Sequence, residues 1–128
     1  MQYLFKKENR FKLFLFGIFL VNLLQAIFTP IIGDEAYYWM YSQYFDWGYF
    51  DHPPAVAIFI KCSSFLFADA LSIRFFTVVF STLTATLIWQ LIPLENRNKP
   101  ASISLYFILL LAIPGFHLYG FITTPDVP

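Results

Sequence analysis

The sequence predicts an all-α integral membrane protein, and three observations lead to this fold class. Of its 128 residues, 59% are hydrophobic. Only 12% are charged, whereas soluble domains carry about 25%. The apolar residues also gather into three runs of roughly spanning length, at about 11–29, 71–92 and 101–119. A soluble domain of this size cannot hide so much apolar surface from water.

Charge and cysteine content exclude other classes. The net charge is zero, which gives no case for nucleic acid as a partner. Cys62 is the single cysteine of the chain, so an intrachain disulfide is excluded.

The first span is expected at about 11–29, after a basic N-terminal stretch. As a helix, its apolar part reaches about 27 Å at ~1.5 Å per residue, close to the ~30 Å hydrocarbon core. Leu24-Gln25-Ala26 is a poor cleavage site, so we interpret the run as an uncleaved helix rather than a signal peptide. Asn22 and Gln25 share one helical face and are expected to bond to a neighbouring helix.

Residues 30–70 are predicted to form a long external loop, rich in the Tyr and Trp residues that favour the membrane interface. We expect one short interfacial helix from Asp34 to about Tyr44, followed by a turn at Trp47-Gly48. A second interfacial or re-entrant helix is expected from Ala55 to Phe67, which is too short to cross a membrane.

Two further spans follow this loop. The second, at about 71–92, comes after Asp69, which is expected to end the preceding helix. A short polar loop at 93–100 leads to the third span, at about 101–119, which should be disturbed near Pro114-Gly115.

The charge distribution predicts the orientation. With the N-terminus in the cytoplasm, six of the eight Lys and Arg residues lie inside: Lys6, Lys7, Arg10, Lys12, Arg97 and Lys99. Six of the eight acids then lie outside: Asp34, Glu35, Asp46, Asp51, Asp69 and Asp126.

Asp34 and Glu35 are the strongest candidates for chemistry, because carboxylates at a membrane edge are costly unless they are used or neutralised. On a helix the two side chains point apart, so they should not share one proton. We assign the chemistry to Asp34 and a supporting role to Glu35. The alternative is that both simply favour the N-terminus of an interfacial helix.

The other candidates are weaker. Asp51 and His52 either form a helix-start turn in which Asp51 is the cap, or bind a phosphate or divalent ion. Lys61 and Arg74 are the two cations expected outside; they either extend to the interface or contact a lipid phosphate. Asp126 alone is typical of a turn.

Three segments together resemble one family: Gly33-Asp34-Glu35-Ala36-Tyr37-Tyr38-Trp39, Tyr49-Phe50-Asp51-His52-Pro53-Pro54 and Thr124-Pro125-Asp126-Val127-Pro128. The family is that of the membrane glycosyltransferases dependent on polyprenyl-phosphate sugars, of the dolichyl-phosphate-mannose protein mannosyltransferase and lipid A aminoarabinose transferase type. The resemblance covers nearly the whole chain from the first span onward. It implies a C-type glycosyltransferase fold with a long first external loop holding two interfacial helices. Family members are several times longer, so the chain is expected to be an N-terminal part that is inactive alone.

The resemblance also implies an activity. A sugar is transferred from a polyprenyl-phosphate donor, with inversion, to a lipid, glycan or protein acceptor on the external face, here the periplasmic face of a bacterial inner membrane. Asp34 would be the catalytic acid that orients or deprotonates the acceptor, supported by Glu35. In the lipid A transferase branch the acid matching Asp51 is associated with a divalent ion, and the cation matching His52, where this chain departs from Lys, is associated with phosphate.

The remaining residues of the candidate substrate site are Lys61, Arg74, Asp126, Tyr38 and Trp39, with the aromatics carrying lipid and stacking on sugar. Two other interpretations stay open. One is a small non-enzymatic lipid-binding or scaffold protein of the cell envelope. The other is a piece of a polyprenyl-lipid transporter, which would favour acids within the spans rather than at their boundary.

Overall fold

The computed structural model describes residues 7–97, 99 and 101–124, and within these ranges the chain is helical with no strand. The helices are α1 (Lys7–Phe28), α2 (Gly33–Gln43), α3 (Ala55–Ser64), α4 (Asp69–Leu91), α5 (Leu94–Arg97), α6 (Ser102–Leu111) and α7 (Pro114–Leu118). The all-α class is therefore confirmed for the described residues.

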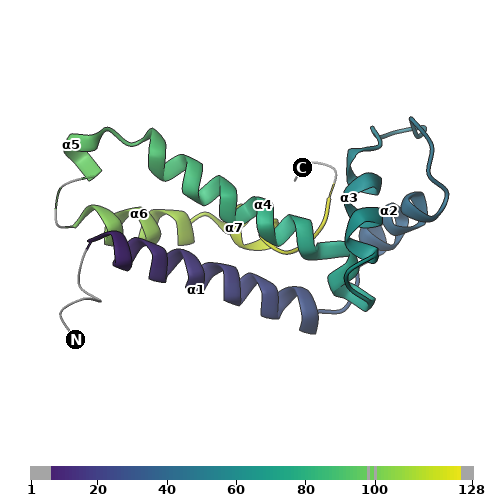
Figure 1. Cartoon of the computed structure of the whole chain (residues 1–128), viewed down its shortest axis with the longest axis horizontal. Helices are drawn as coiled ribbons and strands as arrows, with labels where there is room; N and C mark the ends of the chain where they lie inside the picture. The colour runs from purple at the N-terminus through teal and green to yellow at the C-terminus, as the bar shows by residue number, and fades with distance from the viewer. Residues whose placement is uncertain (1–6, 98, 100, 125–128) are drawn as a thin grey trace.

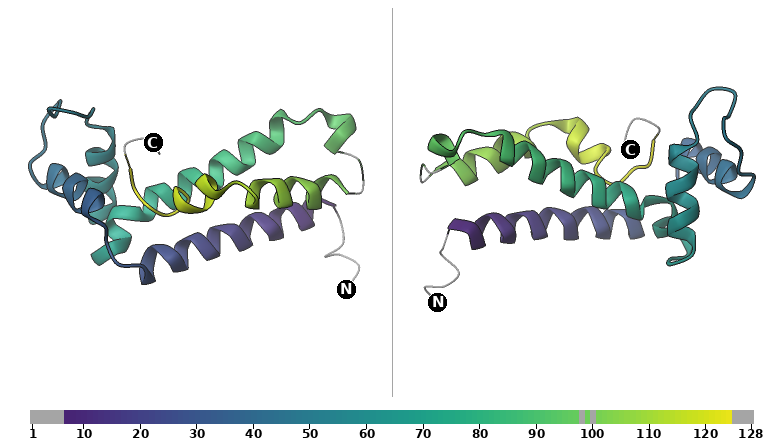
Figure 2. Two further views of the ribbon diagram at one scale, coloured as in Figure 1. Left: turned by 180° about the vertical axis from the view of Figure 1, so that it is seen from behind. Right: turned by 45° about the horizontal axis from the view of Figure 1, so that its top comes forward.

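The long helices α1 and α4 run side by side in opposite directions. Helices α6 and α7 then run along the bundle in the same direction as α1 (Figure 1). Helices α2 and α3 stand at the end where α1 finishes and α4 begins (Figure 2). The loop between α2 and α3 extends away from the bundle at this end.

Helices α1 and α4 are each long and apolar enough to cross a membrane. Only 17% of the most apolar window of α1 and 33% of that of α4 is buried within the protein. Exposed apolar side chains on these helices include Leu13, Phe16, Val21, Leu24, Ile27, Leu83, Leu87 and Leu91. Such a surface suits contact with lipid, which supports association with a membrane.

The third expected span is not one continuous helix in the structure. It consists of α6, with 10 residues, and α7, with 5 residues, separated at Ala112 and Ile113. Pro114 explains the break, because proline lacks a backbone N–H and is tolerated only in the first turn of a helix. Two helices of spanning length, rather than three, are thus present in the described ranges.

The two short helices of the loop occur where they were expected, although their bounds differ. Helix α2 covers Gly33–Gln43 and α3 covers Ala55–Ser64, so α3 is shorter than the expected 55–67. Asp69 does not end α3. It begins α4 instead, with a φ of 52° in the left-handed region. The interfacial location of α2 and α3 stays a prediction.

The core lies in three clusters along the bundle. One joins α4 to α6 through Ala85, Trp89, Ile103, Tyr106, Phe107 and Leu110, and Phe11 of α1 stacks on Trp89 at 5.0 Å between ring centroids. A second, at the loop end, contains Tyr38, Val56, Ile60 and Ile73. The third consists of Ala26, Val78 and Phe121.

Residues 119–124 return along α4 in close contact with both long helices. Asn22 of α1 donates to Ser81 Oγ at 3.2 Å, and Ser81 donates to the carbonyl of Gly120 at 3.1 Å. The predicted interhelical bond is thus confirmed for Asn22, whereas Gln25 Oε1 is buried without a hydrogen-bond partner among the described residues. A Cβ atom at Gly120 would lie 2.6 Å from the Phe116 carbonyl oxygen and 2.8 Å from Asn22 Nδ2. Glycine is therefore required for this close approach.

The two ends of the bundle carry opposite charge. Arg10, Lys12, Arg97 and Lys99 lie near the end where α1 begins, whereas Asp34, Asp46, Asp51 and Asp69 lie near the end with α2 and α3. The structure thus keeps the charge separation on which the orientation was predicted. Which end faces the cytoplasm stays a prediction.

Candidate functional site

The two adjacent acids of α2 have opposite surroundings. Successive side chains on a helix are ~100° apart, so Asp34 and Glu35 face different directions. Asp34 is exposed and makes no hydrogen bond or ion pair with a described residue, whereas Glu35 is fully buried. Of these two acids, Asp34 therefore presents a free carboxylate at this end of the bundle.

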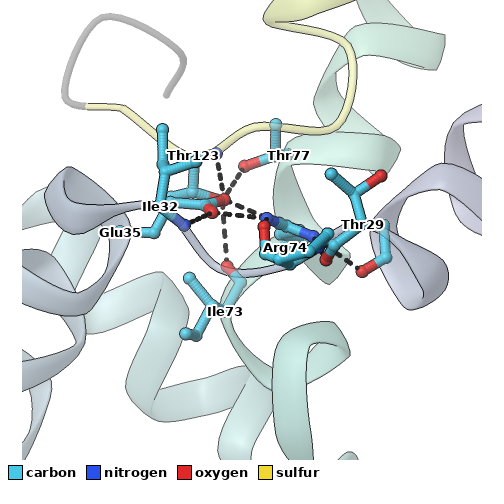
Figure 3. Close-up of polar contacts among 9 residues, drawn as sticks. Thr29, Ile32, Glu35, Ile73, Arg74, Thr77 and Thr123 are labelled. Carbon is cyan, nitrogen blue, oxygen red and sulfur yellow. Dashed lines mark hydrogen bonds and ion pairs between the residues drawn. The ribbon is translucent and has the colours of Figure 1, made fainter.

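Glu35 accepts hydrogen bonds from three different segments (Figure 3). Its Oε1 atom accepts from Arg74 Nε at 2.7 Å and from the backbone N–H of Thr123 at 3.0 Å. Its Oε2 atom accepts from Arg74 Nη2 and from the backbone N–H of Ile32 at 3.2 Å. The Ile32 contact is the carboxylate half of a capping box at the start of α2.

Arg74 uses its other donors on the C-terminal end of α1. Nη1 donates to the carbonyls of Ala26 at 3.1 Å and Thr29 at 2.7 Å, and Nη2 donates to that of Pro30 at 2.9 Å. The last carbonyls of a helix lack partners within it and form the negative end of its dipole. The guanidinium therefore neutralises Glu35 and satisfies the end of α1 at the same time.

These contacts correct the expectation for Arg74. Arg74 does not extend to the interface or to a lipid phosphate, because it is 0% exposed and its five N–H donors are all used within the protein. The carboxylate of Glu35 is occupied by Arg74, Ile32 and Thr123, and its supporting role for Asp34 stays a prediction.

Asp51 is held by two tyrosines on the face of α2 that carries Asp34. Tyr37 and Tyr41 are three and seven residues after Asp34, so these residues form one stripe along the helix. Tyr41 donates to Asp51 Oδ1 at 2.7 Å, and the Tyr37 hydroxyl lies 3.2 Å from each carboxylate oxygen. The hydrogen bond from Tyr41 lowers the pKa of Asp51. Desolvation, together with the bonds to Tyr37 and Asp51, raises the pKa of Tyr41.

His52 and Tyr49 complete this cluster. His52 Nε2 lies 3.6 Å from Asp51 Oδ2, and its ring meets the edge of Tyr38 with centroids 5.4 Å apart. Tyr49 stacks on Tyr41 at 3.7 Å and donates to the Tyr41 carbonyl at 2.8 Å. We call Tyr37, Tyr38, Tyr41, Tyr49, Asp51 and His52 the tyrosine cluster. It folds the α2–α3 loop back onto α2.

Asp51 is not the cap of α3, which was the simpler interpretation of its position. The N-cap of α3 is Pro54, and no side chain bonds to that helix end. The hydrogen bonds of Asp51 are instead directed to α2.

The remaining candidates lie apart from the tyrosine cluster. Trp39 is 44% exposed and lines a separate hollow of about 360 Å³ with Asp69 and Ser72. Lys61 is half-buried in the last turn of α3 and forms no ion pair with a described residue. Asp126 lies outside the described residues, so its role stays a prediction.

The described residues do not fit a divalent metal ion by themselves. No group of three His, Cys, Asp or Glu side chains among them is placed to hold one. Both Asp51 oxygens already lie within hydrogen-bonding distance of tyrosine hydroxyls.

Sequence reasoning missed two parts of the site. The spacing of Tyr37 and Tyr41 places them on the face of Asp34, and this signal was available. The bond from the Thr123 N–H to Glu35 had no such signal, because a backbone donor 88 residues away leaves no trace in residue type.

Comparison with known proteins adds no relative to this site. No protein-family model, curated protein or solved structure matches the chain.

Proposed function

We propose that this chain carries the external site of a membrane glycosyltransferase that uses a polyprenyl-phosphate sugar, with Asp34 as its catalytic carboxylate. One observation carries the proposal: of the two adjacent acids, Asp34 is exposed and unpaired, while Glu35 is buried in an ion pair with Arg74. The motif resemblance supplies the reaction class, and the free carboxylate supplies the group that this reaction needs.

Asp34 is suited to act on an acceptor hydroxyl. It lies in the first turn of α2, where the helix dipole favours a negative charge. In an inverting displacement the acceptor oxygen bonds to the anomeric carbon, its proton passes to Asp34, and the polyprenyl phosphate leaves with the bonding electrons. Such a base must come within about 3 Å of the acceptor oxygen.

The tyrosine cluster lies beside Asp34 on the same face of α2 and offers ring surface for a sugar. Ligand sites combine aromatic walls with a few fixed polar groups. Here the Asp51 carboxylate and the Tyr37 and Tyr41 hydroxyls are those groups. His52 adds a ring nitrogen near Asp51 for contact with a phosphate.

The membrane setting of the proposal rests on α1 and α4. Their largely exposed apolar surfaces favour lipid as the surrounding medium, which supports the proposal of a multi-pass membrane protein. We place the α2–α3 end on the external face, the periplasmic face in a bacterial inner membrane, because the basic residues gather at the opposite end.

The test is sugar transfer by the full encoded chain in membrane vesicles, with a panel of radiolabelled polyprenyl-phosphate sugars. Asp34→Asn should lower transfer by roughly 10²–10⁴-fold, the usual contribution of a general base, with unchanged protein level. Asp46→Asn is the matched control, because Asp46 is an exposed acid of the same loop and bonds only within it. Transfer by Asp34→Asn at the rate of the unmodified protein would remove Asp34 from the mechanism.

The second candidate is a non-enzymatic lipid-binding or scaffold protein of the envelope. It is favoured by an apolar groove of about 340 Å³ beside α1, lined by Leu13, Phe14, Gly17, Ile18, Val21, Asn22, Leu111, Phe116 and His117. Lipid retention that survives Asp34→Asn, combined with no transfer from any donor of the panel, would favour this second function.

A further inference from the structure

The Glu35–Arg74 pair contacts several segments that meet at the loop end of the bundle. Through Ile32 it holds the start of α2, and through Ala26, Thr29 and Pro30 it holds the end of α1. Through Thr123 it also holds the segment that follows α7. All the side-chain atoms of this pair are buried.

The segment 120–124 is otherwise bound to α4 and α1. Thr123 Oγ1 donates to the Ile73 carbonyl at 3.1 Å and lies 2.7 Å from Thr77 Oγ1. Phe121 is buried, and the Arg74 guanidinium lies over its ring at 5.8 Å from the centroid. Among the described residues, this segment is connected to α2 by the hydrogen bond from the Thr123 N–H to Glu35.

Asp34 therefore has a position that depends on a residue it does not contact. In the sequence Asp34 lies between Ile32 and Glu35, the two residues of the capping interaction. The Asp34 side chain itself makes no hydrogen bond or ion pair with a described residue. Whatever moves the Glu35 carboxylate moves the first turn of α2, and Asp34 with it.

We infer that the Glu35–Arg74 pair is a latch that couples the segment 120–124 to the first turn of α2, with Glu35 and Arg74 as positioning residues for Asp34. When the latch opens, the Ile32 and Thr123 amides both lose their bonds to the Glu35 carboxylate, so the two segments loosen together. Because such coupling is reciprocal, a disturbance at segment 120–124 is also felt at Ile32.

Hydrogen–deuterium exchange of the full chain in lipid nanodiscs tests the latch without any assay of activity. Glu35→Gln should speed exchange of both the Ile32 and Thr123 amides by about tenfold or more. Asp34→Asn is the matched control in the same turn and should leave both rates unchanged. An unchanged Thr123 rate in Glu35→Gln would overturn the inference.

Gly120→Ala tests the coupling from the other side. Its added Cβ would press on Phe116 and Asn22 without touching the ion pair, and it should speed exchange at Ile32. Gly17→Ala is its control, because a Cβ there meets nothing within 4 Å. If Glu35→Gln does not accumulate, Gly120→Ala decides alone, and an unchanged Ile32 rate in that variant overturns the latch.

The consequence for catalysis rests on the proposed function. Glu35→Gln should lower kcat for sugar transfer about tenfold or more, in line with misplacement of a catalytic group. The remaining activity should still fall at acidic pH as in the unmodified protein, because Asp34 remains the base. Loss of this fall at acidic pH would make Glu35 the base and overturn its positioning role. Absence of transfer by the unmodified protein would instead reject the proposed function and leave the exchange results standing.

Discussion

The backbone N–H of Thr123 donates a 3.0 Å hydrogen bond to the buried carboxylate of Glu35, 88 residues away in the sequence. The same oxygen accepts from Arg74 Nε. The hydrogen bond from Thr123 thus brings together two of the motifs that resemble the glycosyltransferase family. Glu35 belongs to the first motif, and Thr123 directly precedes the motif that begins at Thr124.

The buried pair should dominate the stability of the loop end. Arg74→Met leaves the Glu35 carboxylate buried without its cation, which should cost about 3–5 kcal/mol of unfolding free energy. Arg74→Lys should lose less, because it keeps the charge but supplies three donors instead of five. The unfolding free energy in bicelles is the measurement.

Two further variants check this prediction. Lys12→Met removes an exposed cation of α1 and should change the unfolding free energy by less than about 0.5 kcal/mol. The double variant Glu35→Leu/Arg74→Met should recover only part of the loss. It removes the unpaired buried charge, but it leaves the Ile32 and Thr123 amides and the carbonyls at the end of α1 without these partners. Equal stability of Arg74→Met and the unmodified protein would contradict the assigned contacts.

The tyrosine hydroxyls should control the ionisation of Asp51. The pKa of Asp51 is lowered in the fold, mainly by the bond from Tyr41. Its contribution to stability is therefore present above the unfolded pKa and lost as pH falls through the folded pKa. Tyr41→Phe should raise the pKa of Asp51, measured by carboxyl-carbon NMR, and Tyr37→Phe should raise it less because its contacts are longer. The reverse ranking of the two variants would show that Tyr41 is not the main donor.

The Tyr41 hydroxyl should titrate late at alkaline pH. Its pKa is raised by desolvation and by its bonds to Tyr37 and Asp51. A raised folded pKa contributes stability below the unfolded value of about 10, and this is lost as pH rises through the folded value. In a titration followed by tyrosinate absorbance, one component should appear at higher pH than the other tyrosines. Tyr41→Phe should remove this component. Tyr44→Phe should retain it, because Tyr44 is an exposed residue near the same loop.

Glycine substitutions should have opposite effects at two positions. Gly120→Ala should destabilise the protein by about 1–3 kcal/mol through overpacking against Phe116 and Asn22. Gly17→Ala should stabilise it by about 0.5–1 kcal/mol, because it lies inside α1 where a Cβ meets no neighbour. Thermal unfolding of the two variants in one detergent compares them directly, and equal shifts would contradict the packing at Gly120.

The orientation is open to a direct test with topology reporters. A reporter fused after Asn96, at the basic end, should locate to the cytoplasm. One fused after Trp47, in the α2–α3 loop, should locate to the outside. The opposite result would reverse the orientation and remove the external site from the proposal.

The helices themselves could be predicted well because their signals are local. The apolar runs that became α1 and α4 are bounded by Pro30, Asp69 and Pro93. Their ends fall within two residues of expectation except at the start of α1, which begins at Lys7, four residues earlier than expected. The third run was less predictable. Pro114 marks where it breaks, but only packing against α1 and α4 decides that Gly120–Thr124 continue as a closely bound segment rather than as helix.

That Asp34 and Glu35 face apart follows from their adjacent positions, because the helical period separates neighbouring side chains. Which of them is free depends on the packing of the helices. The cation that pairs with Glu35 is 39 residues away, and an Arg at that distance is equally compatible with an outward-pointing side chain. Burial between α1, α2 and α4 makes an unpaired charge there prohibitively costly, so Glu35 and Arg74 pair and Asp34 alone stays exposed.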